Sequence, residues 1–482
     1  HRYQYAVILD ADSLMRGDTL VKLVERMERS PSLALLQAPL HLHGGRTLFA
    51  RALQLATSVH GPILTRGLSR WSGPDGNYFG HNAIVRVKAF LECCALPVLA
   101  GKPPFGGHIL SHDFVEAALL CRAGWQVRIA HELTGSWEEL PPTLPEYVAR
   151  DRRWCQGNFQ HLQIMFAAGL KPMSRLHMLV GALMYVASPL WLCFVVLGAL
   201  LVHESGGLPL STPIAIGLLG VTCSVLFGPR ILGFLSTFGD REARKLHGGA
   251  LGLFASVLVE TAFAALLSPI LMLHHTRIVL DIVLGRTTSW GAQNRRGGGN
   301  FGIIARHERF TTLLGLATAL GLYRFAPSPF VWLSPLWVSW LFAIPLVAIA
   351  SSEWAGKLAR TLGLLRTPPE VSPDPLLSRA RELRALTAGD EVARFRDLVL
   401  DPVLLHAHIQ RLAQTAAQKP KGDLEGARQR ALRVGPAALS AEERALLSSC
   451  PDTMKLLHRD AWRTWPVETW QLGRDLAKLP PD

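Results

Sequence analysis

The stretch Tyr5-Ala6-Val7-Ile8-Leu9-Asp10-Ala11-Asp12 decides the fold class of this chain. Its continuous apolar run is typical of a buried β-strand, and two aspartates follow directly. Ligands of open α/β sheets bind beyond the carboxyl ends of the strands, and two carboxylates one residue apart can hold a hard cation against a diphosphate. The pattern therefore predicts a strand that delivers Asp10 and Asp12 to a ligand site. The alternative is that these aspartates cap the next helix.

Around this stretch, residues 1–175 alternate between strand-like and helical runs. Such alternation predicts an α/β domain with a mostly parallel sheet. The chain opens at His1, directly in front of the first strand, and we expect an N-terminal part of the natural protein to precede it. Strands are predicted over residues 5–9, 33–38, 83–85 and 126–130, and helices over 17–27, 47–64 and 113–122.

Residues 176–352 are far more apolar and predict a polytopic membrane domain, since about 20 apolar residues cross a bilayer. The run 250–285 has basic residues on both sides, so it either crosses twice in a broken way or lies partly in the interface. We expect Glu260 in this run to face a pore, because charges within membranes rarely face lipid. The other apolar runs are 176–202, 208–227, 310–325 and 330–350.

Basic residues set the orientation of these runs. They gather at Arg175, 241–245 and 286–309, whereas the short link 203–208 has none. Loops rich in Lys and Arg stay in the cytoplasm. The first two apolar runs are therefore predicted to form a hairpin with its tip outside, which leaves residues 1–175 in the cytoplasm.

The composition of the 482 residues agrees with a membrane protein. Only 18% are charged, against about 25% in ordinary soluble domains. There are 50 Lys and Arg against 37 Asp and Glu, but the basic residues flank apolar runs, so we expect no nucleic-acid partner. The seven cysteines include no CxxC pair and predict reduced thiols. The polar residues 353–482 predict a mainly helical cytoplasmic tail behind a Pro-rich linker at 367–375.

A second chemical motif is Ser111-His112-Asp113-Phe114-Val115-Glu116, at the start of a predicted helix. Asp113 and Glu116 lie three residues apart and share one helix face. Asp113 is a candidate general base at a helix N-terminus. The alternative is a capping box, with Asp113 as N-cap and Glu116 as the third helical residue.

A third motif, Arg150-Asp151-Arg152-Arg153-Trp154-Cys155-Gln156-Gly157, precedes the first apolar run. Arginine side chains bind diphosphates through paired hydrogen bonds, and the ring of Trp154 suits the apolar face of a sugar. The alternative is a basic and aromatic anchor at the membrane surface.

The three motifs occur in this order and fall within or overlap three of the five stretches that carry a resemblance. These stretches are Leu9–Met15, Gly76–Arg86, His108–Ala117, Arg152–Asn158 and Leu457–Trp462. Together they resemble the processive family 2 glycosyltransferases, such as the cellulose and hyaluronan synthases, which carry DxD, a TED-type motif with the base, and QxxRW before membrane helices. His112 replaces the Glu and Arg150 the Gln of this pattern. Both changes fit the subgroup that makes the backbone of osmoregulated periplasmic glucans.

The resemblance implies a GT-A-like α/β domain with a partial parallel sheet, then a helical membrane domain and a helical cytoplasmic tail. The implied reaction is inverting transfer of glucose from UDP-glucose to a growing β-1,2-glucan, coupled to export. It implies Mg²⁺ or Mn²⁺ on Asp10 and Asp12, and Asp113 as the base. The residues placed against substrate or diphosphate are Asp10, Arg150, Arg153, Trp154, His81 and Asn82. For His81 and Asn82 the alternative is turn chemistry.

By analogy with synthase gating loops, a segment at about 272–309 is expected to close over the nucleotide; a solvated loop is the alternative. His274 and His275 are expected to be interfacial rather than metal ligands. The uridine-binding half of the family's sheet should precede residue 1. We therefore expect residues 1–482 alone to bind UDP-glucose poorly and to be inactive.

The predicted domains are residues 1–175, 176–352 and 353–482. The resemblance implies a multi-pass protein of the bacterial inner membrane, with its transferase domain and tail in the cytoplasm. Implied partners are UDP-glucose, the nascent glucan, the lipid bilayer and periplasmic glucan-processing proteins. Two alternative functions stay open: another processive polysaccharide synthase, or a transporter with a nucleotide-sensing domain.

Overall fold

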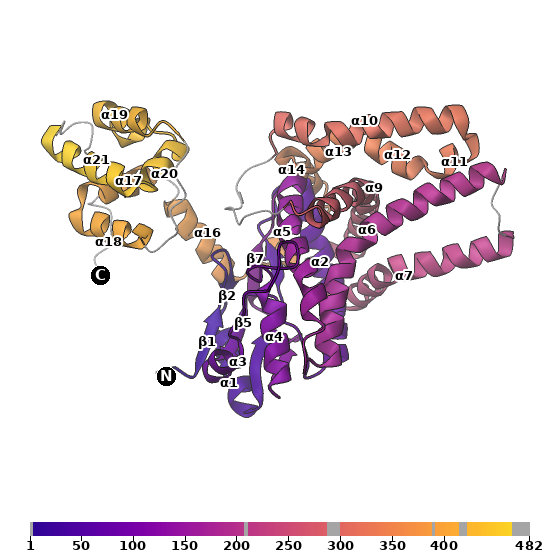
Figure 1. The fold of residues 1–482 in the computed structure, drawn as a ribbon, viewed down its shortest axis with the longest axis horizontal. Helices are drawn as coiled ribbons and strands as arrows, with labels where there is room; N and C mark the ends of the chain where they lie inside the picture. The colour runs from indigo at the N-terminus through magenta and orange to yellow at the C-terminus, as the bar shows by residue number, and fades with distance from the viewer. Residues whose placement is uncertain (1–2, 207–210, 287–298, 388–390, 414–421, 465–482) are drawn as a thin grey trace. The chain divides into compact units, whose positions relative to one another are not determined.

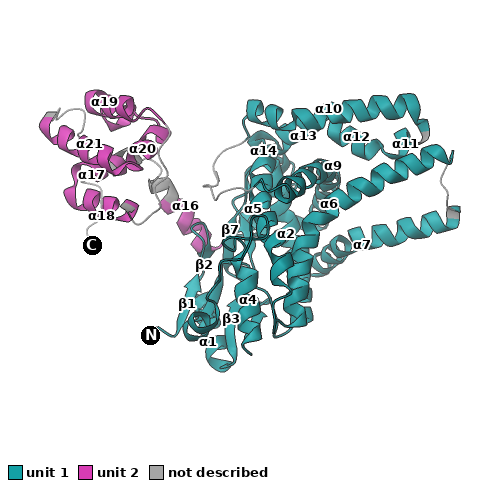
Figure 2. Ribbon diagram, viewed as in Figure 1, with its two compact units in different colours: residues 1–373 teal, residues 374–482 magenta. Residues whose placement is uncertain are grey.

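The computed structural model describes residues 3–206, 211–286, 299–387, 391–413 and 422–464 (Figure 1). The chain divides into two compact units, residues 1–373 and 374–482 (Figure 2). The boundary lies within the Pro-rich stretch 367–375. The first unit holds both the α/β part and the apolar helices, so a division near residue 175 stays a prediction.

The first sheet is mixed rather than mostly parallel. β3 and β6 are parallel, but β5 is antiparallel to both of its neighbours. The alternation of strands and helices is as expected, whereas the prediction of a mostly parallel sheet is wrong. The strand order is β1 (Tyr5–Ile8), β5 (Ala83–Arg86), β3 (Leu33–Gln37) and β6 (Gln126–Ile129).

Helices α1 (Gly17–Arg29), α3 (Val87–Cys93) and α4 (His112–Arg122) cover the two faces of this sheet. Successive residues of β5 point to opposite faces, so Ile84 packs with α1 while Ala83 and Val85 pack with α3 and α4. β1 is an edge strand among the described residues, and Val7 is 37% exposed. The prediction of a buried first strand is therefore wrong.

The direction of β5 follows from the route of the chain after helix α2 (Leu48–Ser72). Asp75 forms a parallel bridge with Val127 of β6. Just beyond β3, the N–H of Ala38 donates to the carbonyl of Asn82 at 3.0 Å. The chain thus runs along the sheet to the carboxyl ends of β3 and β6 before β5 begins. β5 then has to run back in the opposite direction.

A second sheet follows at the edge formed by the carboxyl ends of β3 and β6. Its central strand is β7 (Ser136–Glu139), which is antiparallel to β2 (Leu14–Met15) and parallel to β4 (His41–His43). β2 comes directly after Asp12, and β4 follows β3 after a short connection. Both neighbours therefore hold β7 beside the ligand edge that the sequence predicts.

Helix α5 (Leu144–Ile164) connects this α/β part to the apolar helices. It begins after Thr143, whose hydroxyl accepts a hydrogen bond from the N–H of Glu146. One side of α5 packs against α6 (Pro172–Glu204) and α9 (Gly249–Val283), in a cluster that includes Phe159 and Ile278. Residues on α5 are therefore fixed relative to the apolar helices.

Three described helices are long and apolar enough to cross a membrane: α6, α7 (Thr212–Gly239) and α9. α7 runs back in the direction opposite to α6 (Figure 1). α9 is one continuous helix of 35 residues, so the broken double crossing is wrong. Glu260 of α9, which we expected to face a pore, is buried and forms an ion pair with Arg230 of α7.

The last apolar run is divided into three short helices, whereas the run before it lies in a single helix. The run 310–325 belongs to α10 (Phe301–Phe325), which is not among the three candidates. A Cβ on Gly315 would stand 2.2 Å from the backbone nitrogen of Leu341, so α10 and α12 touch along their backbones. The run 330–350 forms α11 (Pro327–Trp332), α12 (Ser334–Leu341) and α13 (Ala343–Ala350). Of the predicted gating segment at about 272–309, residues 287–298 lie outside the described residues.

The second unit is helical, as the sequence pattern predicts. Its core contains Phe395, Val399, Leu447 and Met454. Its helices are α16 (Pro375–Thr387), α17 (Glu391–Leu400), α18 (Pro402–Ala413), α19 (Leu424–Val434), α20 (Ala441–Ser448) and α21 (Pro451–Thr464). The first unit also contains α8 (Arg241–Leu246), α14 (Glu353–Thr361) and α15 (Pro368–Val371).

Candidate active site

The ends of β1 and β5 bring Asp10 beside His81. Ile8 pairs with Ala83, so the residues just beyond these two strands meet at one edge. His81 Nε2 lies 4.0 Å from Asp10 Oδ2. The side chain of Asp10 is 54% exposed, which leaves it accessible to a ligand. The fold therefore places the first motif next to the 76–86 stretch.

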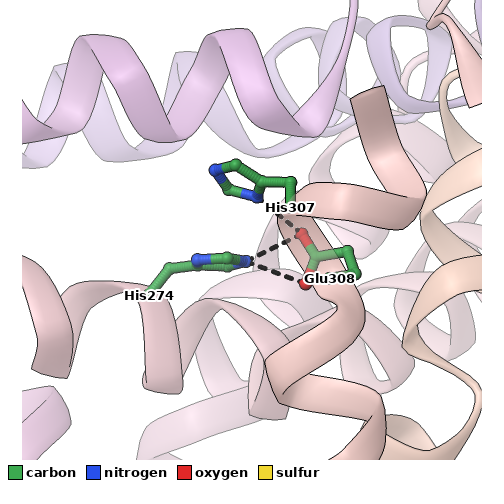
Figure 3. Close-up of side chains that lie close together, drawn as sticks. All are labelled: His274, His307 and Glu308. Atoms are coloured by element: carbon green, nitrogen blue, oxygen red, sulfur yellow. Dashed lines mark hydrogen bonds and ion pairs between the residues drawn. The ribbon is translucent and has the colours of Figure 1, made fainter. Parts of the chain in front are cut away.

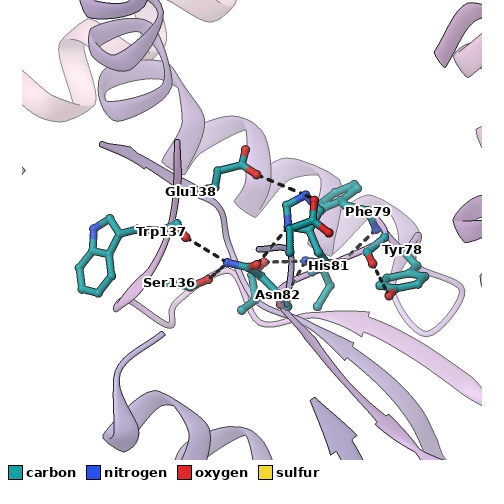
Figure 4. Close-up of polar contacts among 11 residues, drawn as sticks. Tyr78, Phe79, His81, Asn82, Ser136, Trp137 and Glu138 are labelled. Carbon is teal, nitrogen blue, oxygen red and sulfur yellow. Dashed lines mark hydrogen bonds and ion pairs between the residues drawn. The ribbon is translucent and has the colours of Figure 1, made fainter. Parts of the chain in front are cut away.

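The position of His81 is fixed by its neighbours. His81 Nδ1 and Asn82 Oδ1 are 3.0 Å apart, and Asn82 Nδ2 donates to Ser136 Oγ at 2.7 Å (Figure 4). Asn82 is fully buried with a φ of 53°, so it supplies both the turn geometry and the support for His81. Buried Gln37 donates to the carbonyl of His81 at 2.9 Å. These contacts hold the imidazole at the edge of the sheet.

Glu138 of β7 is a site residue that the sequence analysis missed. Its Oε2 lies 3.2 Å from His81 Nε2 (Figure 4). The same nitrogen is the one 4.0 Å from Asp10. Burial raises the pKa of the Glu138 carboxyl, while the charges of His81 and Arg150 oppose the rise. No motif marks this residue in the sequence. Its only signal is an acidic side chain in a short strand ahead of the arginine-rich helix.

Asp113 lies in the first turn of α4, against the loop that carries His81. Ser111 is the N-cap of this helix and makes no side-chain capping bond, and Glu116 pairs with His112 at 3.0 Å. The predicted capping-box alternative is therefore wrong. A Cβ on Gly80, whose φ is 92°, would stand 3.5 Å from Asp113 Oδ2.

The environment of Asp113 favours a proton acceptor. Burial raises the pKa of Asp113 to about 6, although the neighbouring charge of His112 lowers it. A carboxyl with a pKa near 6 is mostly ionised at neutral pH and still takes up a proton readily. The Tyr78 hydroxyl donates to the carbonyl of Gly80 at 2.6 Å and so fixes the loop beside this carboxylate.

Helix α5 presents a pair of guanidinium groups and an indole. Arg150 lies 4.3 Å from the ring centroid of Trp154 and 4.9 Å from that of Tyr147. Burial lowers the pKa of Arg153, and the charge of Arg150 lowers it further, which shows that the two cations are close. Trp154 is 41% exposed. Two adjacent cations next to an exposed indole suit an anionic sugar ligand.

The two residues between Arg150 and Arg153 have another role. Asp151 accepts from His275 of α9 at 2.9 Å, and Arg152 donates to Asp281 of α9 at 2.8 Å. Both contacts attach α5 to α9 and leave the site free. The split follows from helix geometry, because residues three apart share a face and the residues between them do not.

The two aspartates of the DxD motif, Asp10 and Asp12, suit a divalent cation that prefers oxygen ligands. Asp10 and Asp12 lie on a tight turn in which the N–H of Ser13 donates to the carbonyl of Asp10 at 3.0 Å. The one group of three potential metal ligands found among the described residues lies elsewhere, at His274, His307 and Glu308. The motif thus offers two carboxylates, and magnesium sites commonly add water and substrate phosphates to such a pair.

Residues 5–223 match the protein family described as glycosyl transferase family group 2. The match covers the α/β part of the chain. Proteins from Bradyrhizobium diazoefficiens, Shewanella oneidensis and Xylella fastidiosa, each named glucans biosynthesis glucosyltransferase H, are similar to it. Identities are 40% over 84% of the chain, 39% over 85% and 39% over 79%, respectively.

The chain spans 56%, 59% and 62% of the length of those three curated relatives. The matched region contains the DxD motif, the loop before β5, Asp113 and the arginine-rich helix. The fold and the family match therefore point to the same part of the chain.

Proposed function

We propose that the protein containing this chain transfers glucose from UDP-glucose to a growing β-1,2-glucan, with inversion at the anomeric carbon. The observation that carries the proposal is the packing of Asp113, with its raised pKa, against the loop that holds His81 beside Asp10. The names of the three relatives support glucose as the sugar and a glucan as the product.

In this mechanism Asp113 accepts the proton of the acceptor hydroxyl while that oxygen attacks the anomeric carbon. The carbon–oxygen bond to UDP breaks in the same displacement, and the configuration inverts. Trp154 supports the acceptor ring from its exposed position on α5. Gly80 leaves the approach to Asp113 open, because any side chain there would lie against the carboxylate.

The cationic pair Arg150 and Arg153 binds the diphosphate and stabilises the charge that develops on it. A divalent cation, Mg²⁺ or Mn²⁺, held by Asp10 and Asp12 would supply further charge neutralisation at the leaving group. His81, which Asn82 and Glu138 fix, lies next to Asp10 and is placed to hydrogen-bond a substrate oxygen.

We also propose that the chain is a multi-pass protein of the bacterial inner membrane, with the α/β part and the helical tail in the cytoplasm. The candidate spans α6 and α7 join the α/β part to the basic residues of α8, which supports a cytoplasmic position for both. A cytoplasmic tail then requires that the segment from α9 to α13 cross the membrane an even number of times. Export of the glucan through the membrane part, with periplasmic processing proteins as partners, belongs to the same proposal.

The test is Asp113→Asn in the natural full-length protein, assayed in membranes with labelled UDP-glucose. We expect transfer to fall about 100-fold or more while UDP-glucose still binds. The control is Asp18→Asn, on the exposed face of α1, which should keep full activity. Near-normal transfer by the Asp113 variant would refute the role. Linkage analysis of the wild-type product then decides between a β-1,2-glucan and another polysaccharide.

A further inference from the structure

A compact cluster of nitrogen and oxygen ligands lies outside the transferase site. His274 belongs to α9, and His307 and Glu308 belong to α10. One ligand atom from each residue lies within 4.8 Å of the others. His274 Nε2 is 2.9 and 3.1 Å from the two Glu308 oxygens, and His307 Nδ1 is 3.0 Å from Oε1 (Figure 3).

The carboxylate of Glu308 is enclosed, whereas one side of the cluster is open. Glu308 is 0% exposed and the side chain of His274 is 9% exposed, but that of His307 is 40% exposed. Thr311 donates to Glu308 Oε2 at 3.1 Å and holds the carboxylate in place. The arrangement has a buried anchor, an orienting hydrogen bond and a path for a ligand from the His307 side.

The charge of this carboxylate needs a partner. Among the described residues, the ion-pair partners of Glu308 are the two histidines. A buried carboxylate is costly unless it is paired or coordinates a metal ion. A divalent ion at this point would balance the charge and use lone pairs of the carboxylate and of both imidazoles.

We propose that His274, His307 and Glu308 bind a zinc ion that ties α9 to α10. Two imidazoles and one carboxylate are a common donor set for zinc, with water in the fourth position. Ligand atoms of a tetrahedral zinc site lie about 3.3 Å apart, given bonds of about 2.0–2.1 Å. The contacts of the two histidines with Glu308, at 2.9 to 3.1 Å, differ from this by only a few tenths of an ångström, and the two histidine nitrogens lie within 4.8 Å of each other.

This site is separate from the cation of the transferase reaction. Asp10 and Asp12 offer oxygen alone, which favours Mg²⁺ or Mn²⁺, whereas two imidazoles favour zinc. The adjacent His275 is not part of the cluster, because its Nε2 contacts Asp151 of α5. From sequence we expected both histidines to be interfacial. The residues that complete the cluster are on a different helix, so no local spacing indicates them.

The experiment uses the full-length protein, purified in detergent through an affinity tag without histidines. Elemental analysis after dialysis, and competition with a chromogenic zinc chelator, measure stoichiometry and affinity. We expect one zinc per chain in the wild type and at least about 100-fold weaker binding in His274→Ala and His307→Ala. Thr311→Val should still bind one zinc, about 10 to 100-fold more weakly. His203→Ala, an exposed histidine on α6, should match the wild type.

Two further measurements use the wild-type protein and therefore do not require that any variant fold. Replacement of zinc by Co²⁺ in the wild type should give the visible bands of a tetrahedral site without sulfur charge transfer. X-ray absorption should show nitrogen and oxygen neighbours only. Failure of the wild type to compete with the chelator would leave a carboxylate–imidazole ion pair and overturn the proposal. Sulfur neighbours, or zinc retained by both histidine variants, would also overturn it.

Discussion

Replacing Asp113 by asparagine should stabilise the folded chain at neutral pH while it removes the proposed base. Burial raises the pKa of Asp113 from 3.8 to about 6, with the charge of His112 in opposition. Above pH 6 the carboxyl is ionised in both states, and the folded state bears the cost of the buried charge. A rise of about 2 pKa units corresponds to about 3 kcal/mol at most, since one unit is about 1.36 kcal/mol.

The sign of this effect depends on pH. Below about pH 4 the carboxyl is protonated in both the folded and the unfolded chain, so its contribution vanishes. Between about pH 4 and pH 6 the unfolded chain loses the proton first, and the wild type loses stability as the pH rises. The neutral amide of Asp113→Asn carries no such dependence. Its advantage should therefore grow from near zero at pH 4 to a maximum above pH 7.

The assay is thermal unfolding of the detergent-purified protein, followed by fluorescence from pH 4 to pH 8. Asp18→Asn is the matched control. Desolvation raises the pKa of Asp18 slightly, but hydrogen bonds from Lys22 and Arg16 outweigh it and lower the pKa overall. The control variant should show no gain at neutral pH. A pH-independent difference for the Asp113 variant, or a loss of stability at pH 7.5, would refute the reasoning.

Three further predictions concern the site and the membrane topology. Glu138→Gln keeps the shape of the side chain but removes the negative charge beside His81. We expect the pH profile of transfer to shift. An unchanged profile would contradict the placing of this carboxylate in the site. Asp12→Ala should abolish glucose transfer, and excess UDP-glucose should not restore it. A metal chelator should abolish transfer by the wild type, and full activity in the presence of chelator would exclude the cation. A cysteine at Ser205 should react with an impermeant thiol reagent from the periplasmic side, whereas a cysteine at Glu242 of α8 should not. Labelling at position 242 from outside would reverse the proposed membrane orientation.

Local patterns in the sequence predict the elements well but not their pairing. The strands over 33–38 and 126–130 and the helix over 113–122 are present as predicted. The direction of β5 depends on the extended route from Asp75 to Asn82, which only contacts with other strands define. An apolar strand pattern is the same for either direction, so the sequence alone favoured the parallel arrangement.

The candidate site shows the same limit. Asp10, Asp113 and Arg150 could be predicted as site residues because each belongs to a motif with a recognisable spacing. Glu138 has no motif, and its role follows from the pairing of β7 with β2 and β4. The capping alternative for Asp113 was wrong because the helix begins one residue earlier, at His112, and Glu116 turns to that histidine.

Helix α5 links the chemistry to the apolar helices through four consecutive charged residues. Arg150 and Arg153 share one face of the helix and are the pair proposed to bind the diphosphate, while Asp151 and Arg152 bind His275 and Asp281 of α9. The same α9 carries His274, so the proposed zinc site continues the chain of contacts to α10. Any axial movement of α9 would therefore move the cations that the proposed function assigns to the diphosphate. Under the proposed function, the same few polar contacts therefore set both the position of the diphosphate and the arrangement of the apolar helices.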